Sequence, residues 1–488
     1  MSFSAGAAGS ESRHAWVLAC VSFAAYLPSF AGVFQFDDYN VIVNYPTVHS
    51  WQALLEGAGG GVRPLLKASY TLNWTLGPAI FGFHLGNIAV HALNAVLLYW
   101  VGRELCGRWS VECRGAALAA ALFFALHPAQ TEVVTYVSGR SSSLMASFYL
   151  GALLVYLRGG HWAGSALLFI LAAATRETAA TLPAVLLLCE LCSRDRPGWK
   201  VIVRRQAAHW SLLLAGALVL LLNAPYLDLV SFGFTRRSIA ENLLTQIGGV
   251  SYLISRLVSL RGYNIDPALP VLNEWDAALA VEAALLAGLL ILGVFNLRAR
   301  PWVAFGVLWF FLQLAPTNSI VPRLDVANDR QLYLSGWGLF LGLSVQVALL
   351  RPPRRIAATM AGVLLAVLAA SSVQRQLDYA SEIALWESSV RQAPWNARAR
   401  NNLGYAYQMA GRLDEARREY RTALYLEPGH GTARFNLMLL QGDGETADPF
   451  SSKPASAPSR RISGSSRSLR RRQFERNVHR VGCLAPPP

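Results

Sequence analysis

Long apolar runs separated by short polar segments extend along the chain to about residue 373. A helix needs about 20 mostly apolar residues to cross a bilayer, and several runs reach this length only with residues borrowed from their flanks. The pattern predicts an all-α fold, a polytopic membrane helical bundle of about eleven spans in residues 1–376. The runs cover residues 15–33, 84–102, 115–135, 141–157, 161–175, 178–193, 209–225, 277–297, 302–316, 332–350 and 356–373.

Residues 243–260 form a further apolar stretch that does not fit this scheme. Arg256 and two adjacent glycines interrupt it. Counting it as a span would move the later arginine clusters to the opposite side of the membrane. We therefore interpret this stretch as a helix that lies in, or dips into, the outer face of the bilayer.

The composition changes after the last apolar run. Residues 377–440 are charged and amphipathic, and the segment 401–428 fits the tetratricopeptide pattern of about 34 residues, with partial copies on both sides. One full repeat with two half-repeats is short for a solenoid, and such a module typically binds a protein or peptide partner. Residues 441–488 are rich in Ser, Pro, Gly and Arg, which predicts a disordered basic tail. The matching repeat positions are Leu403, Gly404, Tyr407, Ala416, Tyr420, Ala423 and Pro428.

The charged residues are few and lie mainly between the apolar runs. They make up 15% of the chain, and the net charge is +14. A basic chain could bind nucleic acid, but most arginine clusters follow the even-numbered runs or lie in the tail, so orientation in the membrane accounts for them. Because positive loops face the cytoplasm, we expect a cytoplasmic N-terminus, a repeat module on the outer (periplasmic) side and no nucleic-acid partner.

The loop after the first apolar run, residues 33–46, carries two adjacent carboxylates, Asp37 and Asp38. An ionisable pair beside a membrane surface is costly, so it is a candidate functional site. The alternative is an ordinary polar loop that closes a helix. The predicted orientation places further polar residues on the same outer side, namely His127, Glu132, Arg140, Arg176 and Arg330.

A polar stripe crosses the second apolar run. His84, Asn87, His91 and Asn94 recur at helical spacing and therefore share one face. Such a face avoids lipid, so it either forms hydrogen bonds between helices or lines a pocket. A metal held by His84 or His91 with Asp38 is conceivable, but no ligand spacing requires one, and we predict none.

Four stretches read together resemble the transmembrane-and-tetratricopeptide-repeat O-mannosyltransferases and the wider protein O-mannosyltransferase group of GT-C-type glycosyltransferases. The resemblance covers residues 15–440, and the NDRQLYLS segment (328–335) and the repeat module extend it. The stretches are FDDYNVIVNYP (36–46), FHLGNIAVHALN (83–94), HPAQTEVVTYVSGRSSSL (127–144) and TRETAATLP (175–183).

The resemblance implies an enzyme that moves a hexose, with mannose the first candidate, from a polyprenyl phosphate to an acceptor hydroxyl. It implies Asp37 as the base, with Asp38 positioning the acceptor or sharing that role. It implies that Arg140, then Arg330 and Arg176, bind the donor phosphate. The alternatives are that Arg140 snorkels at a helix end, Arg176 pairs with Glu177 and Arg330 pairs with Asp329. The predicted pocket-lining residues are His84, His91, His127 and Glu132.

Two other functions stay open from the sequence. One is a non-catalytic, membrane-anchored repeat scaffold for envelope assembly, and the other is a lipid-linked-glycan ligase or transporter. Because the module holds barely one repeat, the acceptor is either a protein Ser/Thr or an envelope glycan. A composition rich in Ala, Arg and Trp suggests a bacterial inner membrane. The sugar, the prenol length and any need for a divalent metal are open.

Overall fold

The computed structural model describes residues 5–57, 62–111 and 114–442. Within these ranges the regular structure is helical and no strand occurs, so the predicted all-α class is confirmed. The chain divides into two compact units. We call Met1–Gln35 with Pro46–Ser381 the membrane unit, and Phe36–Tyr45 with Glu382–Pro488 the repeat unit.

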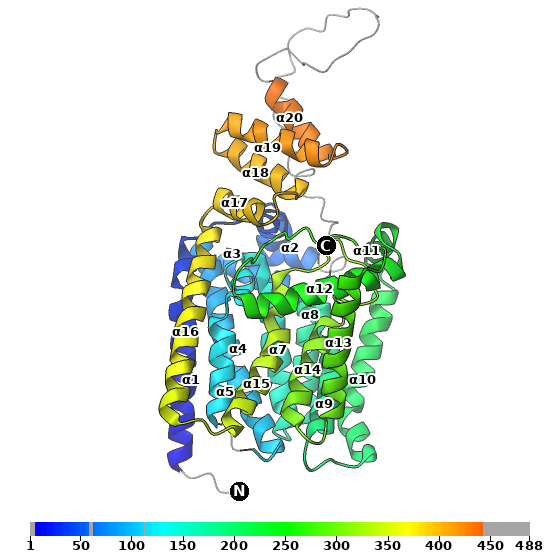
Figure 1. The fold of residues 1–488 in the computed structure, drawn as a ribbon. Helices are drawn as coiled ribbons and strands as arrows, with labels where there is room; N and C mark the ends of the chain where they lie inside the picture. Colours follow the sequence, from blue (N-terminus) through cyan, green and yellow to red (C-terminus); the bar gives the residue numbers. More distant parts are fainter. Residues whose placement is uncertain (1–4, 58–61, 112–113, 443–488) are drawn as a thin grey trace, which may run out of the picture. The chain divides into compact units, whose positions relative to one another are not determined.

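Each predicted apolar run coincides with a helix of the membrane unit, and Figure 1 shows these helices side by side in a bundle. Large apolar side chains such as Leu214, Leu285 and Val363 are mostly exposed on them, as expected for surfaces that face lipid. The helices are α1 (Ala5–Ala25), α4 (Ile80–Arg108), α5 (Arg114–Leu126), α7 (Arg140–Leu157), α8 (Trp162–Thr175), α9 (Leu182–Cys192), α10 (Trp199–Leu221), α13 (Ala277–Phe295), α14 (Pro301–Leu314), α15 (Leu332–Leu349) and α16 (Arg354–Leu377).

Not every one of these helices is long enough to cross a bilayer alone. Among the described residues, 5 helical segments have the required length and apolar character, or up to 7 if each of two bent helix pairs is one span. The helices α8 and α14 are apolar but have only 14 residues each, and α9 has 11. The described helices are therefore those of a multi-pass membrane protein in which several apolar runs form short helices.

The stretch 243–260 lies within α12 (Ile239–Ser259), which is not among the helices that could span a membrane. Figure 1 shows α12 lying across one end of the bundle. In its first half the buried face is polar, with Asn242, Thr245 and Gln246, whereas Ile239 and Leu243 are exposed; in its second half Val250 and Leu253 are buried. This reversed polarity suits a helix at the membrane surface whose inner face hydrogen-bonds to the protein.

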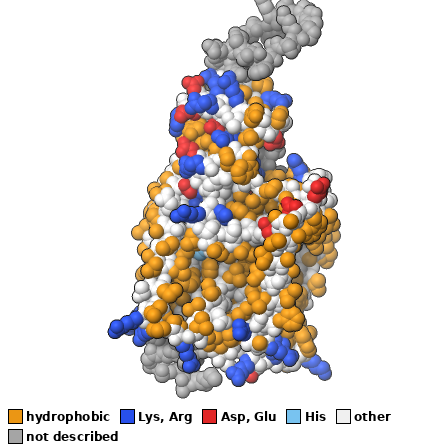
Figure 2. Space-filling view, in the orientation of Figure 1, with side chains coloured by type: hydrophobic (Ala, Val, Ile, Leu, Met, Phe, Trp, Pro, Cys, Tyr) orange, Lys and Arg blue, Asp and Glu red, His pale blue; other side chains and the backbone are white. Residues whose placement is uncertain are grey.

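Basic side chains gather at the opposite end of the bundle. Figure 2 shows Lys and Arg at the lower end, while apolar side chains cover its sides. Two further helices of the membrane unit, α3 (Pro64–Leu76) and α11 (Ala224–Arg236), have 13 residues each. The remaining described helices of this unit are short connections: α2 (Trp51–Glu56), α6 (Thr131–Val134), and the 3₁₀ helices η1 (Leu27–Ala31), η3 (Pro46–Val48), η4 (Pro128–Gln130), η5 (Val137–Gly139), η6 (Glu177–Thr181), η7 (Asp329–Gln331) and η8 (Asp378–Ala380).

Small residues let α14 and α15 pack closely. A Cβ on Gly306 would lie 2.7 Å from the Gly338 carbonyl oxygen, and a Cβ on Gly342 would lie 2.9 Å from the Trp302 carbonyl oxygen. Helix pairs in membranes use such glycines because close backbone approach increases their van der Waals contact. This contact fixes the start of α15, which borders the pocket described below.

The repeat unit consists of α17 (Glu382–Gln392), α18 (Ala397–Met409), α19 (Leu413–Leu426) and α20 (Gly431–Gly442), together with the loop Phe36–Tyr45. The loop contains a π-helix, η2 (Tyr39–Val43). At the centre of the module, Gly404 faces Tyr420, and a Cβ on Gly404 would lie 2.8 Å from the tyrosine ring. Tyr420 is fully buried, as its place in the repeat pattern predicts. Most of the predicted tail, residues 443–488, lies outside the described residues.

Candidate active site

A small pocket opens among the starts of α7 and α15, the end of α14 and η6. It is lined by residues that the sequence separates widely: Ser142, Met145, Arg176, Thr178, Gln313, Thr317, Arg330, Gln331, Tyr333 and Leu334. Two of the three predicted phosphate-binding arginines are therefore on its wall. We call it the arginine pocket.

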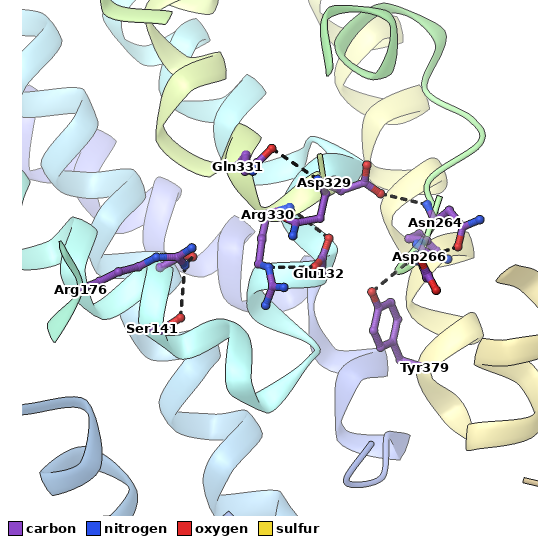
Figure 3. Close-up of polar contacts among 12 residues, drawn as sticks. Glu132, Ser141, Arg176, Asn264, Asp266, Asp329, Arg330, Gln331 and Tyr379 are labelled. Carbon is purple, nitrogen blue, oxygen red and sulfur yellow. Dashed lines mark hydrogen bonds and ion pairs between the residues drawn. The ribbon is translucent and has the colours of Figure 1, made fainter. Parts of the chain in front are cut away.

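Arg176 is a buried cation in this pocket. It follows the last residue of α8 in an extended conformation, and only 7% of it is exposed. Its guanidinium donates hydrogen bonds to the hydroxyls of Ser141, at 3.3 Å, and Ser142, as Figure 3 shows for Ser141. Its Nε has no hydrogen-bond acceptor, and no carboxylate forms an ion pair with it among the described residues.

The carboxylate next to Arg176 is engaged elsewhere. Glu177 accepts two hydrogen bonds from Arg63, at 2.6 and 3.0 Å, so the alternative that Arg176 pairs with Glu177 is not observed. Burial opposes ionisation of Glu177, but the Arg63 charge outweighs it and lowers the pKa of this carboxyl to about 2. Burial, followed by the Arg63 charge, lowers the pKa of Arg176, and the Arg330 charge adds to this.

Arg330 faces a buried carboxylate. Its Nε lies 3.6 Å from Glu132 Oε1, and its backbone N–H donates to Glu132 Oε2 at 3.0 Å. Asp329 points away from Arg330 and accepts from the backbone N–H of Asn264 at 3.0 Å, so the alternative pairing of Arg330 with Asp329 is not observed (Figure 3). Glu132, predicted to line the pocket, is a partner of one of its arginines.

The pocket suits an anion. Ser142 lies in the first turn of α7, and Tyr333 lies in the first turn of α15, so both helices direct the positive ends of their dipoles towards it. The lining residues include two arginines and no carboxylate. Guanidinium groups with hydroxyl neighbours are typical ligands of a phosphate.

Arg140 begins α7, two residues before the pocket residue Ser142, but is not itself among the lining residues. Its donors reach Asn87 Oδ1 at 2.6 Å, Asn73 Oδ1 at 2.5 Å and the carbonyl oxygens of Ser69 and Phe83 at 3.2 and 2.8 Å. Arg140 therefore ties the start of α7 to α3 and α4. Through this anchor it fixes the place of the two serines that contact Arg176.

The predicted polar stripe on α4 is fully buried. His91 contacts the Tyr333 hydroxyl at 3.0 Å, and Asn94 donates to the same hydroxyl at 3.0 Å, so both orient a residue that lines the pocket. Asn87 donates to the carbonyl oxygens of Val134, at the end of α6, and of Tyr136, which follows α6, in keeping with hydrogen bonding between elements. His84 is the fourth member of the stripe.

The other predicted histidine, His127, caps η4. Its Nδ1 accepts from the Ala129 N–H at 3.3 Å, and its Nε2 lies 3.2 Å from the Leu257 carbonyl oxygen. It therefore connects the start of η4 to the end of α12. In residues 5–57, 62–111 and 114–442, no group of three or more His, Cys, Asp or Glu could hold a metal ion.

Asp37 and Asp38 belong to the repeat unit. Asp38 is fully buried and precedes the first residue of η2, whereas Asp37 is half-buried. The sequence did not predict this membership, because it places the loop between two apolar runs. It also did not single out Thr178, although this residue lies in the quoted stretch 175–183, or Gln313 and Thr317, which lie in no quoted motif.

A bundle of apolar helices with an arginine-lined pocket and a tetratricopeptide module defines a multi-pass membrane protein with a C-terminal repeat module. The tetratricopeptide repeat family matches residues 397–430, which confirms the predicted repeat. A protein O-mannosyl-transferase of Caenorhabditis elegans is 24% identical over 450 residues, which are 86% of this chain and 63% of that protein. A protein O-mannosyl-transferase of Homo sapiens is 28% identical over 507 residues, with 88% of this chain and 56% of that protein covered.

A protein O-mannosyl-transferase of Drosophila melanogaster is 33% identical over 227 residues, which are 41% of this chain and 23% of that protein. The resemblance inferred from the four stretches is thus confirmed. The chain spans 63% and 56% of the length of the first two relatives. No solved structure matches it significantly.

Proposed function

We propose that this protein is an integral membrane glycosyltransferase that moves a hexose, with mannose the first candidate, from a polyprenyl phosphate to an acceptor hydroxyl. The acceptor is a protein Ser/Thr or an envelope glycan on the non-cytoplasmic side. The observation that carries the proposal is the arginine pocket. Arg176 is a buried guanidinium without a carboxylate partner among the described residues, and Arg330 and two helix N-termini border the same space.

In the proposed reaction, Arg176 and Arg330 bind the donor phosphate. The acceptor oxygen forms a bond to the sugar carbon, and the bond from that carbon to the phosphate oxygen breaks. The electron pair of the broken bond leaves with the lipid phosphate as an anion, which the guanidinium groups stabilise. Arg140 acts through Ser141 and Ser142, whose hydroxyls hold Arg176.

The acceptor proton goes to a carboxylate, and Asp37 is the first choice. It is half-buried, so water or an acceptor can reach it, whereas Asp38 is fully buried. Asp38 then positions the acceptor or shares the role of base. The basic end of the bundle supports a cytoplasmic location for the inner loops. We propose that the repeat module lies outside, and the composition favours a bacterial inner membrane.

Turnover of defined donors tests this proposal. Purified protein in lipid would be given radiolabelled polyprenyl-phosphate sugars, with the wild type beside Arg176→Gln and the exposed control Arg204→Gln. We expect transfer of one sugar by the wild type and the control, and a loss of about 100-fold in Arg176→Gln, since such electrostatic groups contribute this much to catalysis. Absence of transfer from every donor, or equal transfer by all three proteins, contradicts the enzymatic function and favours a scaffold.

A further inference from the structure

The loop that carries the acidic pair belongs to the repeat unit, although the chain inserts it between two segments of the membrane unit. The chain leaves the membrane unit after Gln35 and returns to it at Pro46. The ten residues between, Phe36–Tyr45, form one compact unit with α17–α20. The carboxylates and the tetratricopeptide helices therefore share a single packing environment.

An aromatic contact joins the loop to the first repeat helix. The Phe36 ring meets the Trp386 ring edge-to-face, with centroids 5.3 Å apart and an interplanar angle of 79°. Trp386 lies on α17 and is 3% exposed. Edge-to-face pairs of this kind are directional, so the contact sets the orientation of the loop as well as its position.

Tyr39, which directly follows the acidic pair, is influenced by charged groups of the same unit. Burial raises the pKa of the Tyr39 phenol to about 12, and the charges of Glu382, at the start of α17, and of Asp38 add to this increase. Tyr405 of α18 contributes to the same electrostatic environment. The Tyr39 phenol is therefore close enough to Asp38, to the start of α17 and to α18 to be influenced by their titratable groups.

The backbone at the start of the loop is in an unfavourable conformation. Phe36 has a φ of 47°, in the left-handed region that side chains with a Cβ rarely adopt. Such a residue persists only where its surroundings determine it, and such residues cluster at functional sites. The following π-helix, Tyr39–Val43, is another rare local structure that is frequent at functional sites. Between these two features lie Asp37 and Asp38.

We propose that Trp386 is a positioning residue for Asp37, so that the repeat module both binds the acceptor and fixes the base that acts on it. This inference rests on the proposed function. Phe36 links α17 to Asp37, because its ring packs against Trp386 and its backbone leads directly into the aspartate. An acceptor polypeptide bound by the module is held by the same unit that carries the base, which favours acceptors that carry their Ser or Thr next to the segment that the module binds.

The competing explanation is that Trp386 is an ordinary core residue of the module. Four proteins separate the two: wild type, Trp386→Ala, the conservative Trp386→Phe, and the control Trp395→Ala, which changes a 61% exposed tryptophan of the same unit. A fifth variant, Phe36→Asn, removes the loop side of the contact without touching the module, and asparagine tolerates the left-handed conformation.

Three measurements are made on the full chain in lipid: hydrogen exchange of residues 36–45, kcat at saturating donor, and the dissociation constant of the donor. In Trp386→Ala and Phe36→Asn we expect faster exchange in the loop, a kcat lower by about 100-fold, since small misplacements of reacting groups have such effects, and unchanged donor binding. Trp386→Phe restores both exchange and kcat, and Trp395→Ala behaves as wild type.

Unchanged loop exchange and unchanged kcat in both Trp386→Ala and Phe36→Asn overturn the inference while the proposed function stands. A lower kcat in Trp386→Ala with a normal kcat in Phe36→Asn also overturns it, because the defect then comes from the module core. If no protein transfers sugar, the proposed function fails, and with it the role of Asp37 as base. Faster loop exchange in the two variants would then show that the contact orders the loop for another purpose.

Discussion

The two units differ in how they hold their charges. In the membrane unit the central cation, Arg176, is buried against hydroxyl groups, and the nearest acid in sequence, Glu177, is bound by Arg63. In the repeat unit the two adjacent acids lie on a ten-residue loop ordered by aromatic side chains. The cation site is therefore built by packing within one bundle, whereas the acidic site depends on a contact between segments that lie far apart in the sequence.

The largest expected effect concerns the acids. Asp37→Asn removes the proposed base while keeping size and hydrogen-bonding capacity, so kcat should fall by about 1,000-fold, within the usual range for general-base catalysis. Binding of the donor, which we assign to the membrane unit, should not change. Steady-state transfer and donor titration measure the two quantities. A smaller loss in Asp37→Asn than in Asp38→Asn would reverse the assignment of the base.

A conservative change in the membrane unit should alter donor binding, the quantity that Asp37→Asn is expected to leave unchanged. Arg176→Lys keeps the charge but loses the planar fork that contacts both serines and can bind a phosphate with paired donors. We expect donor binding to weaken by about 10-fold, the equivalent of one charge-assisted hydrogen bond. Titration with a polyprenyl phosphate measures this, and Arg204→Lys on the exposed face of α10 is the control. Equal binding by both variants would remove Arg176 from the donor site.

A single added methyl group should lower the stability of the repeat unit and leave that of the membrane unit unchanged. Gly404→Ala would place a Cβ 2.8 Å from the Tyr420 ring, and overpacking of this kind typically costs about 1–3 kcal/mol. The repeat unit should unfold at a lower temperature while donor binding by the membrane unit persists. Gly429→Ala, where nothing lies within 4 Å, is the control. Loss of donor binding in Gly404→Ala would show that the two units do not act independently in this respect.

The smallest effect comes from the ion pair beside the pocket. The pKa of Glu177 is lowered from 4.5 to about 2, so the folded state binds fewer protons than the unfolded state. The stabilisation is therefore complete above about pH 4.5 and disappears as the pH falls towards 2. The side chain is 38% exposed, so Glu177→Gln should cost only about 0.2–1 kcal/mol at neutral pH. Thermal unfolding measured between pH 3 and 7 checks this, and equal pH dependence in both proteins would contradict it.

The fold could largely be predicted from hydrophobic pattern because helices in lipid satisfy their own backbone groups, and each apolar run became a helix. The repeat offsets likewise predicted that Gly404 and Tyr420 would meet. The number of complete spans was harder to predict, because α8, α9 and α14 are short helices whose length the pattern does not fix.

The pairing of charges could not be predicted. Sequence proximity suggested, as alternatives to phosphate binding, that Arg176 pairs with Glu177 and Arg330 with Asp329, but the adjacent carboxylates are engaged elsewhere. The observed partners come from 114 residues away for Glu177 and 198 residues away for Arg330. The contact between Phe36 and Trp386 is of the same kind, since no local pattern connects the two segments.

That contact also determines how the protein can be dissected. The polypeptide passes between the two units at three points, after Gln35, after Tyr45 and after Ser381. A fragment that starts at residue 382 would expose the indole that Phe36 normally covers, and a fragment that ends at residue 381 would leave the acidic loop without its partner helices. A soluble version of the module suited to screening peptide libraries therefore requires residues 36–45 to be fused to it as a leading segment.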